Sequence, residues 1–248
     1  MRFAKVYRMK PRMLVLPMLF VATLVCACAS MQARDVTALL PAAARQAGLV
    51  DVRGFVPDAQ LDIRYATTHN FVGARIDGYN APRCWLHRPA AEALAKVAMD
   101  VRGQGLRLHI YDCYRPARAV AHFMRWANDL DDQRTKTEFY PRLEKSTLVP
   151  GYIAERSGHS RGATIDLTLS RCDANDVCVT LDMGTTYDLF DARANTDNAD
   201  VTATQRANRD LLRDAMQGRG FANYPMEWWH FTFKPEPTPD TFFDIPLE

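Results

Sequence analysis

Hydrophobic residues recur at helical spacing in several stretches of the chain. One stretch begins at Pro89, carries Leu94, Val97 and Ala98 on one face, and ends before Gly103. Because proline suits the first turn of a helix and glycine ends one, this pattern predicts a helix over 89–102. Similar patterns predict three more helices, over 36–49, 116–130 and 202–217.

Other stretches alternate apolar and more polar residues, which is typical of β-strands. The clearest strand is 106–111, and four more are predicted over 55–65, 163–169, 177–183 and 224–233. Residues 67–82 are rich in Gly and Asn and read as a loop that lines a site. Helices and strands are interspersed, and no repeat or linker divides the chain. We therefore predict a single compact domain of the α+β class.

The first 29 residues read as an export signal. A basic region ending at Arg12 precedes an apolar run over 13–25, and the small residues Ala27-Cys28-Ala29 follow. This order is typical of a cleaved secretory signal peptide, and the run is short for a membrane span. Lipid attachment at Cys28 and an uncleaved anchor are the alternatives. We predict an exported, periplasmic protein whose mature domain is 30–248 and has no membrane span.

The overall charge gives little support to a nucleic-acid partner. The formal net charge of +2 includes five basic residues of the leader, whereas all 29 Asp and Glu residues lie after it. Beyond residue 29 the charge is therefore near −3. Hydrophobic residues make up 48% and charged residues 24%, which is ordinary for a globular protein. No polybasic patch or nucleic-acid module is present, so we predict no nucleic-acid binding.

Four of the six cysteines lie beyond the leader. An even number in an exported chain favours disulfides. Cys172 and Cys178 flank a polar, turn-like segment, which indicates a local bridge and leaves Cys84 to pair with Cys113. A zinc–cysteine site is the alternative, but the spacings are irregular and no C-x-x-C is present.

Two motifs bring together residues that suit a catalytic zinc site. Ser157-Gly158-His159-Ser160-Arg161-Gly162 is followed by Asp166, and Glu227-Trp228-Trp229-His230 comes late in the chain. Two histidines and a carboxylate leave one zinc position open, and a further carboxylate can act as general base. His159 and Asp166 are seven residues apart, and an odd separation puts two residues on opposite faces of a straight strand. For both to face one metal ion the chain must bend between them, and Ser160-Arg161-Gly162 can supply the bend.

Each motif alone has an ordinary structural interpretation. A lone histidine is more often a core or surface side chain than a metal ligand. Trp228 and Trp229 suit a water-excluding wall of the site and the ordinary hydrophobic core equally well. Arg115 lies where a predicted strand ends and a helix begins. It could donate a hydrogen bond to the oxyanion that forms in the reaction, or it could simply be an arginine at a helix start that pairs with Asp112. The histidines read as structural or surface residues are His69, His87, His109 and His122.

From about Leu61 to Pro246 the chain resembles the D-alanyl-D-alanine dipeptidases, the VanX-like zinc enzymes. The matching motifs are Asp62-Ile63-Arg64-Tyr65-Ala66-Thr67, Asn70-Phe71, Asp77-Gly78-Tyr79, Tyr114-Arg115-Pro116, Ser157-Gly158-His159-Ser160-Arg161-Gly162, Asp166-Leu167-Thr168-Leu169, Met183-Gly184-Thr185, Glu227-Trp228-Trp229-His230 and Phe242-Phe243-Asp244. Chance explains so many ordered matches poorly. The resemblance implies a central antiparallel sheet with helices packed around it and the zinc site on the sheet.

The resemblance also implies a role for each matched residue. His159, Asp166 and His230 match the ligands of one zinc ion. Glu227 matches the catalytic base, and Arg115 matches the arginine that stabilises the transition state. Asp188 matches the carboxylate that holds the free amino terminus of the substrate. The other residues that match the substrate pocket are Ser157, Tyr65 and Tyr79.

The implied reaction is zinc-dependent hydrolysis of the small free dipeptide D-Ala-D-Ala to two D-alanines. The best-known members lack the export leader and the four mature cysteines. An exported enzyme cannot directly deplete a cytoplasmic precursor, which favours cell-wall turnover or salvage over drug resistance. The alternatives are a carboxypeptidase or endopeptidase acting on longer wall peptides and a non-catalytic, zinc-stabilised binding module. An intact Glu227 and Arg115 count against the module.

Overall fold

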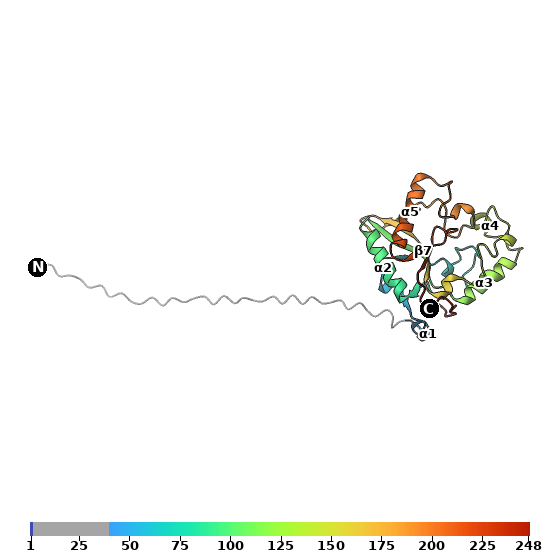
Figure 1. Cartoon of the computed structure of the whole chain (residues 1–248), viewed down its shortest axis with the longest axis horizontal. Helices are drawn as coiled ribbons and strands as arrows, with labels where there is room; N and C mark the ends of the chain where they lie inside the picture. Colours follow the sequence, from blue (N-terminus) through green and yellow to red (C-terminus); the bar gives the residue numbers. More distant parts are fainter. Residues whose placement is uncertain (2–39) are drawn as a thin grey trace. The chain divides into compact units, whose positions relative to one another are not determined.

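A six-stranded sheet lies at the centre of the computed structural model, which describes Met1 and residues 40–248 (Figure 1). The predicted export signal and Cys28 lie outside the described residues. The strand order is β2–β4–β5–β8–β7, and β6 pairs with β5. The strands are β2 (Gln60–Leu61), β4 (Leu106–Asp112), β5 (Thr164–Cys172), β6 (Cys178–Thr180), β7 (Phe221–Asn223) and β8 (His230–Phe233). A separate pair joins β1 (Leu49–Asp51) to β3 (Trp85–His87).

The predicted antiparallel sheet is confirmed with one exception. Strand β2 runs parallel to β4, whereas every other pair in the six-stranded sheet is antiparallel. In β5 the first seven residues are all buried, so both faces of the sheet are covered at this strand. Its alternate residues are apolar on one face and polar on the other, and Asp166 and Thr168 belong to the polar face.

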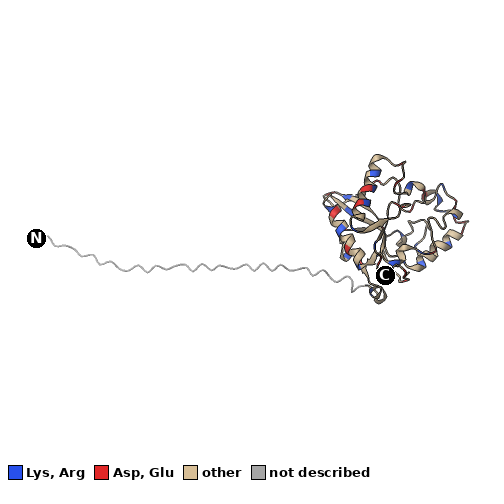
Figure 2. Ribbon diagram, in the orientation of Figure 1, with Lys and Arg blue, Asp and Glu red and all other residues tan. Residues whose placement is uncertain are grey.

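The described residues form three long helices, two of which contact strands of the sheet. They are α2 (Arg88–Arg102), α3 (Ala117–Asn128) and α5 (Ala203–Gln217), and two short helices are α1 (Ala42–Gln46) and α4 (Lys136–Phe139). Helix α2 contacts β4 and α5, and α5 contacts β7. Thr202 caps α5 in a capping box with Gln205, which satisfies two otherwise unpaired backbone groups. Basic and acidic residues are interspersed along α2 and α5, whereas α3 carries only basic ones (Figure 2).

The predicted boundaries hold where the periodicity is long and fail where elements are short. The stretch 55–65 forms only the two residues of β2 as a strand, and a 3-10 turn follows over Arg64–Ala66. That turn buries Tyr65, so the apolar residues serve the core without a continuous strand. Within 36–49, the described residues form only the five-residue α1 before β1 begins at Leu49. Strand β3 was not predicted, because three residues carry no recognisable period.

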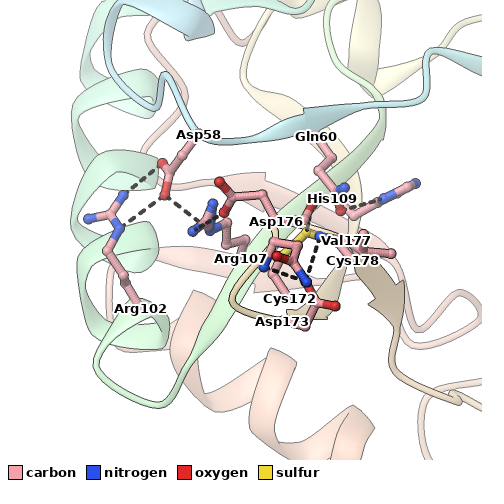
Figure 3. The surroundings of a disulfide bond; sticks show 11 residues. Asp58, Gln60, Arg102, Arg107, His109, Cys172, Asp173, Asp176, Val177 and Cys178 are labelled. Carbon is pink, nitrogen blue, oxygen red and sulfur yellow. Dashed lines mark hydrogen bonds and ion pairs between the residues drawn. A yellow bond between two sulfur atoms is a disulfide. The ribbon is translucent and has the colours of Figure 1, made fainter.

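Both predicted disulfides are present. Cys172 and Cys178 face each other in the β5–β6 hairpin and close it (Figure 3). Beside this bridge Asp176 pairs with Arg107 at 3.0 Å, which ties the hairpin turn to β4. Cys84 and Cys113 form the second bridge, which joins the start of β3 to the end of β4 across 29 residues. The alternative of a zinc–cysteine site is therefore wrong. Among the described helices, none has the length and apolar character that a membrane crossing requires.

Candidate metal centre

Asp166 and His230 meet because β5 and β8 are neighbouring antiparallel strands. The two residues are directly opposite in the register, so their side chains project from the same face of the sheet. His159 reaches them from a 3-10 turn over Gly158–Arg161, immediately before β5. Gly162 ends this turn with φ at +74°, and a Cβ here would lie 2.7 Å from a methyl carbon of Leu49. The predicted bend is confirmed, and glycine is required at its end.

The three side chains converge at the spacing of tetrahedral metal ligands. His159 Nε2 lies 3.3 Å from His230 Nδ1 and 3.3 Å from Asp166 Oδ2. His230 Nδ1 lies 3.1 Å from Asp166 Oδ1. Ligand atoms at zinc distances of 2.0–2.1 Å in a tetrahedron lie about 3.3 Å apart. The group of His159, Asp166 and His230 can therefore hold a metal ion with little movement.

One buried oxygen tests this fit. Asp166 Oδ1 has no hydrogen-bond partner among the described residues, although His230 Nδ1 is only 3.1 Å away. An unpaired buried carboxylate oxygen is costly, and a cation between the three residues removes that cost. Burial favours a raised pKa for Asp166, but the nearby His159 and His230 outweigh it and lower the pKa. The site therefore favours negative charge on Asp166, as a metal ligand requires.

The candidate ligands are oriented by a second layer of contacts. His159 Nδ1 donates to the carbonyl oxygen of Cys113 at 2.7 Å, which leaves Nε2 facing the site. The hydroxyl of Tyr187 donates to Asp166 Oδ2 at 3.0 Å. Cys113 is itself anchored by its disulfide to Cys84. The sequence motifs did not reveal this carbonyl contact, since it depends on the end of β4 reaching the turn before β5.

Glu227 lies beside the three residues without belonging to them. Its Oε2 is 3.3 Å from His230 Nδ1, and its side chain is 15% exposed. The tight turn from Tyr224 to His230 places it there, closed by a bond from the Glu227 N–H to the Tyr224 carbonyl oxygen at 3.0 Å. Burial favours a lowered pKa for His230, but hydrogen bonding to Asp166 and then to Glu227 outweighs it and raises the pKa to about 9. This position suits a base that acts on water next to the metal.

Arg115 faces the same site from the start of α3. Its Nε donates to Asp112 Oδ2 at 3.0 Å, and its Nη2 lies 3.8 Å from Asp166 Oδ2. Its guanidinium also covers the ring of Tyr65, 5.0 Å from the centroid. Arg115 therefore pairs with Asp112, as one interpretation expected, and also lines the cavity, while its role as an oxyanion donor stays a prediction.

A cavity of about 230 Å³ opens beside these residues. It is smaller than the pockets of about 300–1,000 Å³ that take drug-sized ligands, so its ligand must be small. Its polar lining includes His159, Asp166, Asp188, Glu227 and His230. Asp188 is almost fully buried, and both of its oxygens accept from the hydroxyl of Tyr65, at 3.1 and 3.0 Å. Burial, and then Asp166, raise the pKa of Asp188 well above its usual value.

A family model described as "D-ala-D-ala dipeptidase" matches residues 45–248. The chain belongs to this peptidase family. A D-alanyl-D-alanine dipeptidase of Streptomyces coelicolor is 43% identical over 77% of this chain and 94% of that protein. One of Enterococcus faecium is 37% identical over 78% of this chain and 95% of that protein. A D-alanyl-D-alanine dipeptidase of Escherichia coli is 36% identical over 74% of this chain and 83% of that protein. The similarity to each of them covers about three quarters of this chain.

Within this dipeptidase-family fold, the structure brings most of the predicted site residues to the cavity. Ser157 and Tyr65 line it, together with Arg115 and Asp188. Tyr79 does not line it, contrary to expectation. Its fully buried hydroxyl instead donates to Asp112 Oδ1 at 2.6 Å, behind the cavity wall. Tyr79 therefore supports the site through Asp112.

Asp112 is the residue that sequence reasoning undervalued. It is fully buried, accepts from Tyr79 and Arg115, and has Oδ2 3.5 Å from His159 Nδ1. Burial raises its pKa, and Arg115 is the largest opposing influence. Its only sequence signal was its place three residues before Arg115, which is also the spacing of an ordinary local ion pair.

The two tryptophans of the late motif do not line the cavity. Trp228 and Trp229 are buried, and Trp228 Nε1 donates to Thr185 Oγ1 at 2.7 Å. Trp229 packs edge-on against Tyr187 and so supports the tyrosine that contacts Asp166. The other histidines bond elsewhere: His69 with Glu138, His87 with Thr238, His109 with Asp62 and His122 with Asp77.

Proposed function

We propose that this protein hydrolyses the free dipeptide D-Ala-D-Ala to two D-alanines. The observation that carries the proposal is the buried His159, Asp166 and His230 group at tetrahedral spacing, beside Glu227 and a small cavity. Family membership supports the reaction class, since the three relatives above are named D-alanyl-D-alanine dipeptidases.

We propose that His159, Asp166 and His230 hold one zinc ion. Two imidazoles and one carboxylate are a donor set that zinc favours, and three protein ligands leave a position open. When bound, zinc supplies positive charge that polarises a peptide carbonyl and makes a neighbouring water more acidic. The hydrogen bonds from His159 to the Cys113 carbonyl and from Tyr187 to Asp166 keep the donor atoms directed at the site.

Glu227 acts as the general base in this proposal. It takes a proton from the attacking water and returns it to the amine that leaves. Arg115 donates to the oxygen that becomes negative as water attacks the carbonyl. Its ion pair with Asp112 fixes the guanidinium in place before substrate binds, so no free energy is spent on ordering it.

Asp188 binds the ammonium group of the substrate. Its carboxylate is buried at the cavity wall and is bonded by the Tyr65 hydroxyl. An ammonium brought into contact stabilises the ionised form of a carboxylate that burial otherwise disfavours. Ser157 contacts the same end of the substrate. A peptide with a blocked or extended amino terminus leaves Asp188 unpaired, which restricts the enzyme to free dipeptides.

The proposed setting is the periplasm, where the enzyme serves cell-wall turnover or salvage. Residues 1–29 form the export signal and 30–248 the dipeptidase domain in this proposal. The two disulfides support an oxidising compartment, because such bonds persist outside the cytoplasm. Lipid attachment at Cys28 is the alternative to release.

Release of D-alanine from D-Ala-D-Ala by the purified protein tests the function. The assay is run as isolated, with a chelator, and after zinc is added back. We expect cleavage that the chelator stops and zinc restores. Purified muropeptides run in parallel distinguish the carboxypeptidase alternative. No cleavage of either substrate by protein that binds zinc stoichiometrically would contradict an enzymatic role.

A further inference from the structure

Two arginines line the cavity, and they differ in what surrounds them. They are Arg115 and Arg156. A free dipeptide is a zwitterion, so it needs a cationic partner for its carboxylate as well as an anionic partner for its ammonium. The proposed function gives the ammonium to Asp188 and leaves the carboxylate without a partner.

Arg115 is a poor candidate for that partner. Its side chain is only 12% exposed, its Nε is bonded to Asp112 at 3.0 Å, and Asp166 lies 3.8 Å from Nη2. Two carboxylates therefore already balance its single charge. Its Nη1 donates to Ser157 Oγ at 3.4 Å. The proposed function already assigns this guanidinium to the oxygen that becomes negative during the reaction.

Arg156 has the opposite surroundings. It is exposed at the cavity rim, and among the described residues no carboxylate lies within ion-pair distance of it. Its guanidinium stacks on the ring of Phe242, with Cζ 3.7 Å from the centroid. Stacking on a ring holds a guanidinium in place and leaves its N–H edge free for a carboxylate.

The ring beneath Arg156 is itself fixed. The N–H of the next residue, Phe243, donates to the Ser160 carbonyl oxygen at 2.9 Å, and its own carbonyl accepts from Ala117 at 3.0 Å. These bonds tie the C-terminal segment to the turn that carries His159. The second arginine near the same ring, Arg161, is neutralised by Glu236 through two hydrogen bonds. Arg156 is thus an unpaired arginine, among the described residues, that lines the same cavity as the candidate metal ligands.

We propose that Arg156 binds the carboxylate of the substrate and makes a free C-terminus a requirement. The assignment rests on the proposed function and deepens it. Asp188 and Arg156, which line the same cavity as His159, Asp166 and His230, then recognise the two ends of one small molecule. Arg156 positions the substrate and takes no part in the proton transfers, so its loss acts on KM and leaves kcat nearly unchanged.

The test compares D-Ala-D-Ala with its C-terminal amide, which lacks the negative charge. The wild-type protein should favour the free acid by about tenfold in kcat/KM, the lower end for a charged hydrogen bond because the site is at the rim. Arg156→Ala should raise KM for the acid about tenfold, with kcat within about twofold, and leave KM for the amide unchanged. Arg156→Lys should retain part of the preference.

Arg88→Ala is the matched control, because Arg88 is also exposed and stacks on a phenylalanine, Phe55, far from the cavity. It should leave both substrates unaffected. A variant Arg156→Gln, which keeps the stem and removes the charge, should behave as Arg156→Ala. An unchanged acid preference in Arg156→Ala or Arg156→Gln, or no preference in the wild type, would overturn the inference while leaving the dipeptidase function intact. A wild-type protein that cleaves neither compound would refute the proposed function itself.

Discussion

At the scale of single residues, the site divides the work between carboxylates according to their surroundings. Asp166 is buried among two histidines and has a lowered pKa, whereas Asp188 is buried beside Tyr65 and Asp166 and has a raised one. Glu227 is the most accessible of the three, with 15% of its side chain exposed. Asp166 thus suits a metal ion, Asp188 a substrate cation and Glu227 a proton that is being transferred.

The proposed base predicts a specific loss of turnover. Glu227→Gln keeps the shape of the side chain and removes its ability to accept a proton. We expect kcat for D-Ala-D-Ala to fall about 10³-fold, within the range of general-base effects, while zinc content stays at one per chain. Metal analysis and steady-state kinetics on the same preparation check this.

Glu138→Gln is the control, since Glu138 pairs with His69 on the surface and should be silent. Activity of Glu227→Gln within tenfold of wild type would remove Glu227 from its proposed role.

Asp188 permits a test of amine recognition that spares the backbone. Its φ of +61° lies in the left-handed region, which asparagine tolerates well. Asp188→Asn should lower kcat/KM for the free dipeptide about 100-fold and lose discrimination against N-acetyl-D-Ala-D-Ala. Asp176→Asn has the same backbone conformation, with φ of +59°, in the β5–β6 hairpin and should change neither value. If Asp188→Asn still cleaves the free dipeptide normally and still rejects the acetylated one, the ammonium binds elsewhere.

At the scale of elements, the turn before β5 determines whether His159 reaches the sheet. Gly162→Ala places a Cβ 2.7 Å from Leu49 and forces a non-glycine residue to φ of +74°. We expect a loss of about 2 kcal/mol or more in unfolding free energy and weaker zinc binding, as His159 shifts. Urea unfolding and zinc titration measure both effects.

Gly103→Ala provides the matching control for the turn. Gly103 ends α2 in an ordinary right-handed conformation, and an added Cβ meets only ordinary contacts there. Its stability should change little. Equal effects of the two substitutions would mean that the turn geometry is not what holds His159.

At the scale of the whole molecule, a metal bound between β5, β8 and the preceding turn links distant parts of the chain. His159 and His230 are separated by 71 residues. Zinc at about 100 times its dissociation constant should stabilise the fold by about 2.7 kcal/mol, which is about 5–10 °C in Tm for a domain of this size. A chelator should remove that increment.

Two histidine variants make the metal test specific. His230→Ala should abolish the zinc-dependent shift in Tm. His122→Ala should keep it, since His122 bonds to Asp77 away from the cavity. A shift that survives in His230→Ala would show that the metal binds at another place.

Local signals in the sequence are enough to predict the long elements and the residues proposed to react. Helix α2, strand β4 and helix α5 follow from periodicity and from proline, glycine and threonine at their ends, because those signals are local. The motifs around His159, Asp166, Glu227 and His230 indicate zinc chemistry from residue type and spacing alone. Short elements such as β3 escaped, since three residues cannot display a period.

Only the tertiary structure decided which side chains meet. The pairing of Asp166 with His230 depends on the register between β5 and β8, and Asp112 joins the site only because β4 lies beside β5. The same packing places Tyr79 behind the cavity and Arg156 on its rim. Contacts between residues far apart in the chain follow from strand register and loop closure, and neither leaves a periodic trace in the sequence.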